Sequence, residues 1–455
     1  MTRLGPRSPR RRLALLLAGA GALAACSRGA PDAARPNVLI VVVDALRADR
    51  LGVNGYPLPT SPAIDELARS GVNFSRAFSN ATWTKPAIAT LFTSRFPSEH
   101  GLVTLPGERG GELIADGIAP SLPTLAEAFR AAGYSTAALV NQVHLEQELG
   151  FGRGFERYQQ RRHRDGFKMV RELVDWLHGG LAEKPFFVYL HLLDTHWPYD
   201  SRLPRPRRRF GSLDTKVRAP VQLPKVREWV QSGIDPDDLR ALGARYDEEV
   251  AVADQAIGEL AAALAAEGVL ERTILVVTAD HGEGFLEHGH LMHGYAPYDE
   301  VLRVPLVMRL PPTLGMPTGS RSSLVSHVDL GPTLADLAGV RLPSLPRAAS
   351  YRALLAGSED PSRQVFAQTD SAWAVRSATH KLILTTGGQR ELYDLVADPG
   401  ERHNLATATT CPDPCPRLLD ALHDFRAALA PPPASTPRRP LTDEEIRELK
   451  ALGYL

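Results

Sequence analysis

The stretch "NVLIVVVD" (residues 37–44) is a continuous apolar run that ends on a carboxylate. Such a run, bounded by polar residues, is typical of a parallel strand that is buried on both faces. Ligands of open parallel sheets bind beyond the carboxyl ends of the strands. The sequence therefore predicts a central strand, and it places Asp44 where a functional site is expected.

Further apolar segments repeat this pattern along the chain. They are residues 134–140, 185–194, 273–282 and 304–310, and helical patterns separate them. Alternating strands and helices predict an α/β fold in which helices flank both faces of a central sheet. Asp44, Asp194 and Asp280 all follow strands in this scheme, so their carboxylates can converge at one edge of the sheet.

The sequence pattern changes after about residue 340. Short strands alternate with turns over residues 371–405, which predicts a small antiparallel sheet. The tail "LTDEEIRELKALGYL" has Thr442 and Glu445 in capping-box register before a terminal helix. We expect a main domain over residues 37–340 and a C-terminal subdomain with a terminal helix over residues 341–455.

The first residues have the features of an export signal. A basic start is followed by an apolar run of about a dozen residues, too short to span a bilayer comfortably. "LAAC" (residues 23–26) resembles the lipobox of bacterial lipoproteins. We expect a signal peptide over residues 1–25, a tether over residues 26–36 anchored through a lipid on Cys26, and a membrane lipoprotein on the periplasmic or cell-surface side. A plain cleaved signal with an incidental cysteine is the alternative.

The other two cysteines fit an exported protein. Cys411 and Cys415 lie in "TCPDPCPR", where a Pro-rich turn can close a disulfide between them. Export permits that bond because the compartment is oxidising. Two free thiols are the alternative.

The charge balance argues against one class of partner. Fifty-two Lys and Arg oppose fifty-two Asp and Glu, so the formal net charge is zero. A neutral chain gives no electrostatic reason to expect nucleic acid. Residues 201–227 are rich in Pro and Arg; we interpret them as a solvated loop, with a basic lid over an anionic substrate or lipid headgroups as the alternative.

The segment "DHGEGFLEHGHLMHG" (residues 280–294) indicates a metal site. Asp280 and His281 directly follow a predicted strand, and a carboxylate with an imidazole suits a divalent cation such as Zn²⁺ or Mn²⁺. A polar surface loop with incidental histidines is the alternative. Asp44 alone could cap a helix, but beside Asp280 it is better explained as a metal ligand. His196, past another strand end, could protonate a leaving oxygen or be an ordinary loop residue.

In "TWTKPAIATLFTS" (residues 82–94), Thr84 is expected at the N-cap of a helix, with Pro86 in the first turn. A capping threonine is the simplest interpretation of this stretch. The functional alternative is that the free amides and the dipole at this helix end favour a bound phosphate or sulfate. A metal-bound Thr84 hydroxyl would also lose its proton more readily and act as a nucleophile.

Taken in order, these motifs resemble the sulfatase branch of the alkaline phosphatase superfamily over roughly residues 37–410. They are "VVVDALRADRLG", "TKPAIATLFTSRFPSEHG", "GYSTAALV", "HLLDTHWPY", "TADHGEGFLEHG", "HKLIL" and "ELYDLVADPGERHNLA". The resemblance implies an alkaline-phosphatase-like central sheet flanked by helices, with a small C-terminal antiparallel subdomain. It also implies a divalent metal ion (Mn, Zn, Ca or Mg) held by Asp44, Asp280 and His281, with His196 serving the leaving group.

The departures from the family pattern concern the reaction itself. Sulfatases carry a Cys or Ser that is oxidised to formylglycine, and Thr84 stands at that position. Ile88 replaces the usual Arg, Ala45 replaces a second Asp, and the expected Gly-Lys is Val140-Asn141. Because threonine carries a methyl group and one hydroxyl, it cannot form the aldehyde on which the sulfatase route depends.

Threonine is the nucleophile in related branches, the nucleotide pyrophosphatase/phosphodiesterases and the lipoteichoic-acid-type phosphoglycerol transferases. Resemblance to them implies a metal-dependent hydrolase or transferase of phosphoesters that works through a covalent Thr84 intermediate on an anionic ester substrate. The implied metal ligands are Asp44, Thr84, Asp280 and His281, and the implied contacts to the phosphoryl oxygens are Asn141, His196, His293 and Lys381.

Two other functions stay open from the sequence. One is a sulfuric ester hydrolase without formylglycine, in which Thr84 or metal-bound water attacks sulfur directly. The other is a non-catalytic binding protein on the same fold. The missing Arg, Lys and Asp favour the binding protein, whereas four retained convergent ligands oppose it. A second metal ion on Asp194 and His293 is a further alternative.

Overall fold

The computed structural model describes residues 35–454, apart from residues 106, 110–111, 163–164, 200–209, 211–222, 344 and 346. The chain divides into two compact units, residues 1–34 and 35–455, and the description below concerns the second. The predicted signal peptide, Cys26 and most of the Pro- and Arg-rich segment lie outside the described residues. Among the helices that the structure describes, none combines the length and the apolar character that a membrane span requires.

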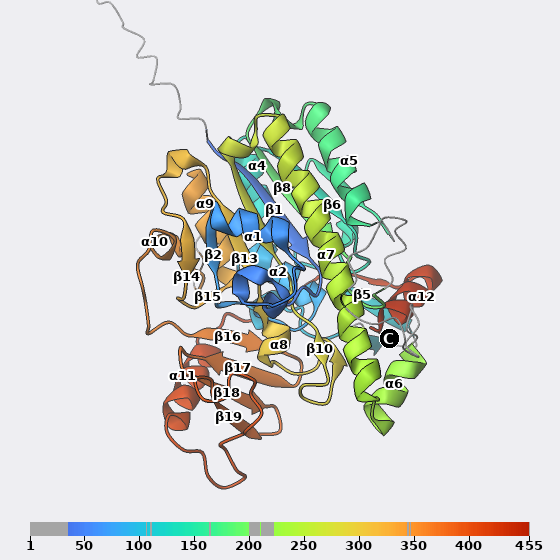
Figure 1. Ribbon diagram of the computed structural model, residues 1–455, viewed down its shortest axis with the longest axis vertical. Coiled ribbons are helices and arrows are strands. Elements are labelled where there is room, and N and C mark those ends of the chain that lie inside the picture. The colour runs from blue at the N-terminus through green and yellow to red at the C-terminus, as the bar shows by residue number, and fades with distance from the viewer. Residues whose placement is uncertain are drawn as a thin grey trace, which may run out of the picture. The chain divides into compact units, whose positions relative to one another are not determined.

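An eight-stranded sheet lies at the centre of the fold (Figure 1). Its strands are β1 (Asn37–Val43), β2 (Val72–Phe74), β6 (Ser135–Val140), β7 (Arg157–Gln160), β8 (Phe186–Leu192), β9 (Thr273–Thr278), β13 (Leu306–Arg309) and β14 (Gly319–Arg321). Their spatial order is β14-β2-β13-β9-β1-β8-β6-β7. Strands β9, β1, β8, β6 and β7 run parallel, whereas β13 is antiparallel to β9 and β2. The α/β fold with a mixed central sheet is therefore confirmed.

Helices cover both faces of this sheet (Figure 1). On one side α1 (Pro62–Arg69) and α5 (Gly166–His178) pack against the long α7 (Pro236–Ala266). On the other side α2 (Thr84–Thr93) packs against α4 (Leu125–Ala131) and α9 (Leu330–Ala338). The remaining helices of the main domain are α3 (Pro97–His100), α6 (Leu223–Ser232), α8 (Asp299–Leu302) and α10 (Arg352–Leu355).

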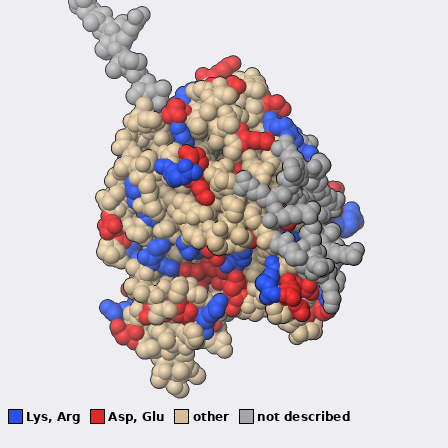
Figure 2. All heavy atoms as spheres, in the orientation of Figure 1, with Lys and Arg blue, Asp and Glu red and all other residues tan. Residues whose placement is uncertain are grey.

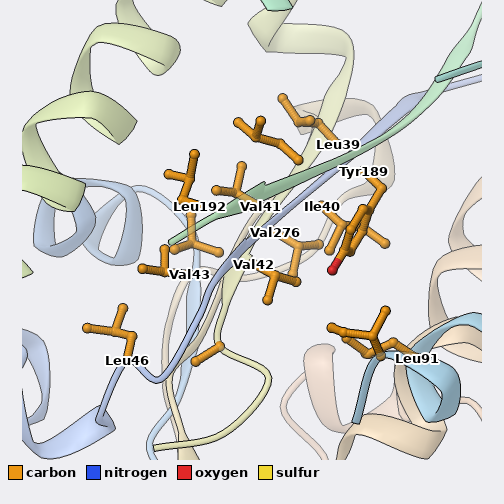
Figure 3. Close-up of a cluster of buried hydrophobic side chains, with 14 of the residues drawn as sticks. Leu39, Ile40, Val41, Val42, Val43, Leu46, Leu91, Tyr189, Leu192 and Val276 are labelled. Atoms are coloured by element: carbon orange, nitrogen blue, oxygen red, sulfur yellow. The ribbon is translucent and has the colours of Figure 1, made fainter. Parts of the chain in front are cut away.

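Strand β1 is buried along its whole length. Figure 3 shows Leu39, Val41 and Val43 on one side of it, and Ile40 and Val42 on the other, next to Leu91 of α2. A strand between two helix layers has no solvent-facing side, so both sets of alternating side chains are apolar. This packing fixes the position of β1 and, with it, the residue that follows.

The C-terminal part forms a second sheet. It consists of β16 (Val365–Gln368), β17 (Ala372–Arg376), β18 (His380–Thr385) and β19 (Arg390–Asp394), all antiparallel. Helix α11 (Cys415–Ala427) contacts β17 and β18. A disulfide joins Cys411 to Cys415 at the start of α11. The predicted small antiparallel subdomain is confirmed.

The end of the chain returns to the main domain. Strand β20 (Arg438–Pro440) pairs with β5 (Glu112–Asp116), which also pairs with β4 (Gly107–Arg109). Helix α12 (Asp443–Leu452) follows, with the predicted capping box of Thr442 and Glu445. The other short strands are β3 (Ala77–Phe78), β10 (Gly284–Phe285), β11 (Leu291–Met292), β12 (Arg303–Val304) and β15 (Val325–Ser326).

Acidic and basic side chains are mixed on the face drawn in Figure 2. Both signs gather over α8, where Asp299 forms ion pairs with Arg376 and Lys381. Lys381 also pairs with Glu401. These contacts link the C-terminal sheet to the main domain.

Candidate active site

Adjacent strand ends bring the predicted residues together. Because β9, β1, β8 and β6 are parallel neighbours, their carboxyl ends meet at one edge of the sheet. Asp44 follows β1, His196 lies four residues beyond β8, and Asp280 and His281 come shortly after β9. All four side chains are buried. The sequence pattern thus located these residues at one edge, as the structure places them.

Thr84, in the first turn of α2, also lies among these side chains at the strand ends. The helix begins at Thr84 after the extended residue Trp83, so the expectation that Thr84 is the N-cap is wrong by one residue. The side chain of Trp83, the N-cap, makes no capping hydrogen bond. Its Oγ1 lies 3.4 Å from Asp44 Oδ2 and 3.3 Å from His281 Nε2. The hydroxyl is therefore directed at the strand ends.

Asp44, Asp280 and His281 each direct one ligand atom to a common point, with these atoms within 4.8 Å of one another. Asp44 Oδ1 and Asp280 Oδ2 are buried and accept no hydrogen bond from the described residues. They lie 3.5 and 3.4 Å from His281 Nε2. A buried carboxylate oxygen without a partner is costly, and a divalent cation would satisfy both. The residues present therefore fit a metal ion.

Asp44 is held in place by its second oxygen. Its Oδ2 accepts hydrogen bonds from Gln142 Nε2 at 2.7 Å and from His191 Nε2 at 3.1 Å. The hydroxyl of Tyr189 donates to His191 Nδ1 at 2.8 Å, which leaves the Nε2 proton for Asp44. Such outer contacts orient a carboxylate ligand, so that Oδ1 faces the metal position.

Backbone groups orient the other two ligands. Asp280 Oδ1 accepts from the amides of Ala45 at 3.1 Å and of His281 at 2.9 Å. Ala45 has a left-handed backbone with φ of 59°, a conformation that costs about 1 kcal/mol outside glycine and persists where surrounding contacts require it. His281 Nδ1–H donates to the carbonyl of Gly282 at 2.8 Å, leaving the Nε2 lone pair for a metal.

We expect Gln142→Leu to weaken metal binding by about 10- to 100-fold, the usual effect of removing an outer partner of a ligand. The physical reason is that Asp44 loses its shortest hydrogen bond and can rotate. Calorimetric titration with Mn²⁺ gives the dissociation constant. Gln389→Leu, at an exposed turn, is the matched control. An unchanged constant in Gln142→Leu would contradict this role.

A second set of side chains faces Thr84 across the site. His196 Nδ1–H donates to the carbonyl of Trp197 at 2.8 Å, and His293 Nδ1–H donates to Glu283 at 3.0 Å. The free Nε2 atoms of both rings face the hydroxyl of Tyr454, at 3.0 and 3.2 Å. That hydroxyl also lies 3.0 Å from Thr84 Oγ1. A residue at the very end of the chain thus reaches the centre of the site.

The pKa shifts at the metal position show a lack of positive charge. Burial, and then the neighbouring charge of Asp44, raise the pKa of Asp280 to about 7. Burial raises the pKa of Glu283 to about 7 as well. Burial also lowers the pKa of His281 and lowers that of His293 to about 3. A bound cation would shift the carboxyl groups back toward their charged form.

Lys85 follows Thr84 but belongs to a different environment. Its ammonium donates to the carbonyl of Asp116 at 3.1 Å, and the residue is only 3% exposed. Burial lowers the pKa of Lys85 to about 8, against attraction from Glu146. The protonated lysine is therefore expensive in the folded protein.

We expect Lys85→Met to change how stability depends on pH. Between pH 8 and the ordinary lysine value of 10.5 the unfolded chain binds the extra proton, so Lys85 makes the free energy of unfolding rise with pH. The destabilisation is complete below pH 8, on the order of 3 kcal/mol, and disappears above 10.5. Urea unfolding at pH 7.5 and 10 should show a smaller rise in the variant. An equal rise in both proteins would contradict the assignment.

Three predicted residues lie differently. Lys381 pairs with Asp299 and Glu401 at 2.8 Å each, so its contacts give no support to a role in substrate binding. Asn141 is buried at the end of β6, and its contact with a phosphoryl group stays a prediction. Asp194 accepts from the amide of Gly166 at the start of α5 and is not in the metal-ligand group found among the described residues.

A family model described as "Sulfatase" matches residues 36–340, and one described as "N-sulphoglucosamine sulphohydrolase, C-terminal" matches residues 287–427. An uncharacterized sulfatase of Escherichia coli (strain K12) is 26% identical over 462 residues, 88% of each chain. A Delta 4,5-hexuronate-2-O-sulfatase of Bacteroides thetaiotaomicron is 25% identical over 84% of this chain and 87% of its own.

Among solved structures, a phosphonate monoester hydrolase of Agrobacterium radiobacter superposes with a TM-score of 0.70. It is 21% identical, and the match covers 86% of this chain and 95% of the hydrolase. At this identity the likeness concerns the fold alone.

Proposed function

The chain belongs to the sulfatase family of hydrolases, and from this membership we propose a metal-dependent hydrolase or transferase of phosphoesters in which Thr84 is the nucleophile. One observation carries the proposal. The Thr84 hydroxyl lies within 3.4 Å of Asp44 and 3.3 Å of His281, two members of the metal-ligand group. A threonine that only capped its helix would direct its oxygen to the helix amides.

The chemistry of threonine separates two substrate classes. The sulfatase route needs an aldehyde that reforms to expel sulfate, and a threonine side chain cannot supply it. A hydroxyl can, however, attack phosphorus and be released by a second attack on the phosphothreonine. The fold does not distinguish between sulfate and phosphorus esters as substrates. The B. thetaiotaomicron relative is named for a sulfate ester, and the A. radiobacter neighbour for a phosphonate ester.

The proposed reaction has two steps. The Thr84 oxygen forms a bond to phosphorus, its proton passes to a basic group or water at the site, and the bond from phosphorus to the leaving oxygen breaks. Protonated His196 donates its Nε2 proton to that oxygen. Water or an alcohol then attacks phosphorus while His196 Nε2 takes its proton. The bond from phosphorus to the Thr84 oxygen breaks, and that oxygen regains its proton from the group or water that accepted it in the first step.

The protein groups divide this work by position. Asp44, Asp280, His281 and Thr84 would hold a divalent ion, which when bound supplies positive charge that favours the Thr84 alkoxide and the developing charge on the phosphoryl oxygens. Thr84 stands at the start of α2, and the positive end of a helix dipole favours an anion there. His293, whose Nδ1–H donates to Glu283, would contact a phosphoryl oxygen through its Nε2.

The test compares three esters. The purified protein with Mn²⁺ is assayed on an aryl phosphodiester, an aryl phosphate and an aryl sulfate. We expect turnover of at least one phosphoester well above that of the sulfate, and the same activity whether or not a formylglycine-generating enzyme is expressed with it. Preferred turnover of the sulfate would favour a formylglycine-independent sulfatase. Metal binding without turnover of any ester would favour the non-catalytic binding protein.

A further inference from the structure

The Tyr454 hydroxyl lies between the two groups that would act at opposite ends of the scissile bond. It is 3.0 Å from Thr84 Oγ1 and 3.0 Å from His196 Nε2. A phosphoryl group that is attacked by Thr84 while His196 protonates its leaving oxygen must lie between the same two atoms. Because the phenol oxygen is within hydrogen-bond distance of both, the phosphoryl group and the phenol exclude each other.

The ring of Tyr454 occupies a defined pocket. It packs edge-on against His144, with ring centroids 4.3 Å apart, and lies 6.2 Å from the ring of Trp83. Leu449 and Leu452 of α12 belong to the same buried cluster. The end of the chain is therefore held by apolar and aromatic contacts as well as by its hydrogen bonds.

Ion pairs hold the helix that carries this tyrosine. Arg162 pairs with Glu448 of α12 at 2.9 Å, and Arg439 pairs with Glu445 and with Glu146 of the main domain. The arginine side chains are 29% and 30% exposed. Ion pairs that water reaches are individually weak, and none of these residues belongs to the central sheet.

The docked segment leaves no room for an ester. Thr84 and His281 have no exposed surface, and His196 is 3% exposed. The chain before the segment is anchored elsewhere, because Pro440 lies opposite Ile114 and the Leu441 amide donates to Leu113. The natural pivot therefore comes after Leu441.

We propose that Thr442–Tyr454, the C-terminal plug, is an autoinhibitory segment that occupies the place of the substrate's reacting group and must withdraw before an ester binds. The inference rests on the proposed function for the identity of that group. It explains why a hydroxyl-bearing side chain closes a site whose nucleophile and leaving-group histidine are otherwise arranged for catalysis.

The first test measures turnover of an aryl phosphodiester by the full chain, by Tyr454→Ala and by a variant lacking residues 442–455. If the C-terminal plug is withdrawn in only about 1–10% of the molecules, kcat/KM rises about 10- to 100-fold when the plug is removed. A synthetic peptide of residues 442–455 should then inhibit the truncated protein competitively. Lys450→Ala, on the exposed side of α12, is the control and should behave as the full chain. If the truncated variant does not fold, the comparison of kcat/KM between Tyr454→Ala and the full chain tests the proposal.

The second test does not depend on turnover. Calorimetry measures the affinity for inorganic phosphate in the presence of Mn²⁺, and we expect binding at least tenfold tighter in Tyr454→Ala. Tighter phosphate binding without turnover of any ester would uphold the plug and refute the proposed function. Unchanged phosphate affinity, or a fall of kcat/KM in Tyr454→Ala, would overturn the plug; the fall would make the phenol part of the reaction instead.

Discussion

Thr84→Ala should lower kcat/KM for a phosphoester by about three orders of magnitude or more, the scale expected when a covalent nucleophile is removed. The change deletes an oxygen that lies 3.4 Å from Asp44 Oδ2 and 3.3 Å from His281 Nε2. Thr84→Ser keeps that oxygen and should retain most of the activity. Comparison of Thr84→Ala with Thr84→Ser separates the contribution of the hydroxyl from that of the methyl group.

The same experiment can show the covalent step directly. Acid quenching during turnover should trap a phosphoryl group on the peptide that contains residue 84, detected by mass spectrometry as a mass increase lost in Thr84→Ala. Retained turnover in Thr84→Ala would mean that water attacks the ester without a covalent intermediate. Thr84 would then be at most a metal ligand.

The central part of the site was predictable because it depends on local patterns. Asp44, Asp280 and His281 each follow a buried apolar strand, and the parallel arrangement of neighbouring strands places such residues at one edge. Periodicity and strand order suffice for that inference. Gln142 and Glu283 were missed although they sit next to predicted residues; the strand-end argument applied to Asn141 would have reached Gln142 one position later.

Other features depend on distances along the chain that a pattern does not encode. The segment over residues 304–310 was recognisable as a strand, but its antiparallel direction is set by pairing with β9 and β2. The N-cap of α2 is Trp83 and not Thr84 as expected, and the Thr84 hydroxyl contacts Asp44 at the end of a distant strand. Tyr454 contacts Thr84 across 370 positions, and nothing in "ALGYL" distinguishes an exposed tail from one that enters a site.

The departures from the family pattern form a consistent set in this structure. Ile88, at the position of the usual arginine, is fully buried and supplies no positive charge. Ala45 uses its amide, rather than a carboxylate, to contact Asp280. The metal group therefore has one carboxylate fewer than a site with Asp at residue 45, which suits one cation and a threonine oxygen as the additional ligand.

Removing the metal should abolish activity as completely as removing Thr84 does. Without a cation, Asp44 Oδ1 and Asp280 Oδ2 are buried and accept no hydrogen bond from the described residues, and no positive charge favours loss of the Thr84 proton. Chelation followed by dialysis should lower kcat/KM by about three orders of magnitude, and added Mn²⁺ or Zn²⁺ should restore it. Full activity in a protein shown to be metal-free would contradict the metal-dependent mechanism.

Metal affinity should also depend on pH in a way that identifies one ligand. Because burial and Asp44 raise the pKa of Asp280 to about 7 in the metal-free protein, a proton competes with the cation below that pH. The metal dissociation constant should therefore rise about tenfold for each unit of pH below 7. Asp280→Asn should bind metal at least about 100-fold more weakly and lose most of this pH dependence. The control Asp424→Asn, at an exposed position, should keep the metal affinity and the pH dependence of the unaltered protein. If the slope survives in Asp280→Asn, the competing proton belongs to another group, and Asp280 is not the ligand that titrates.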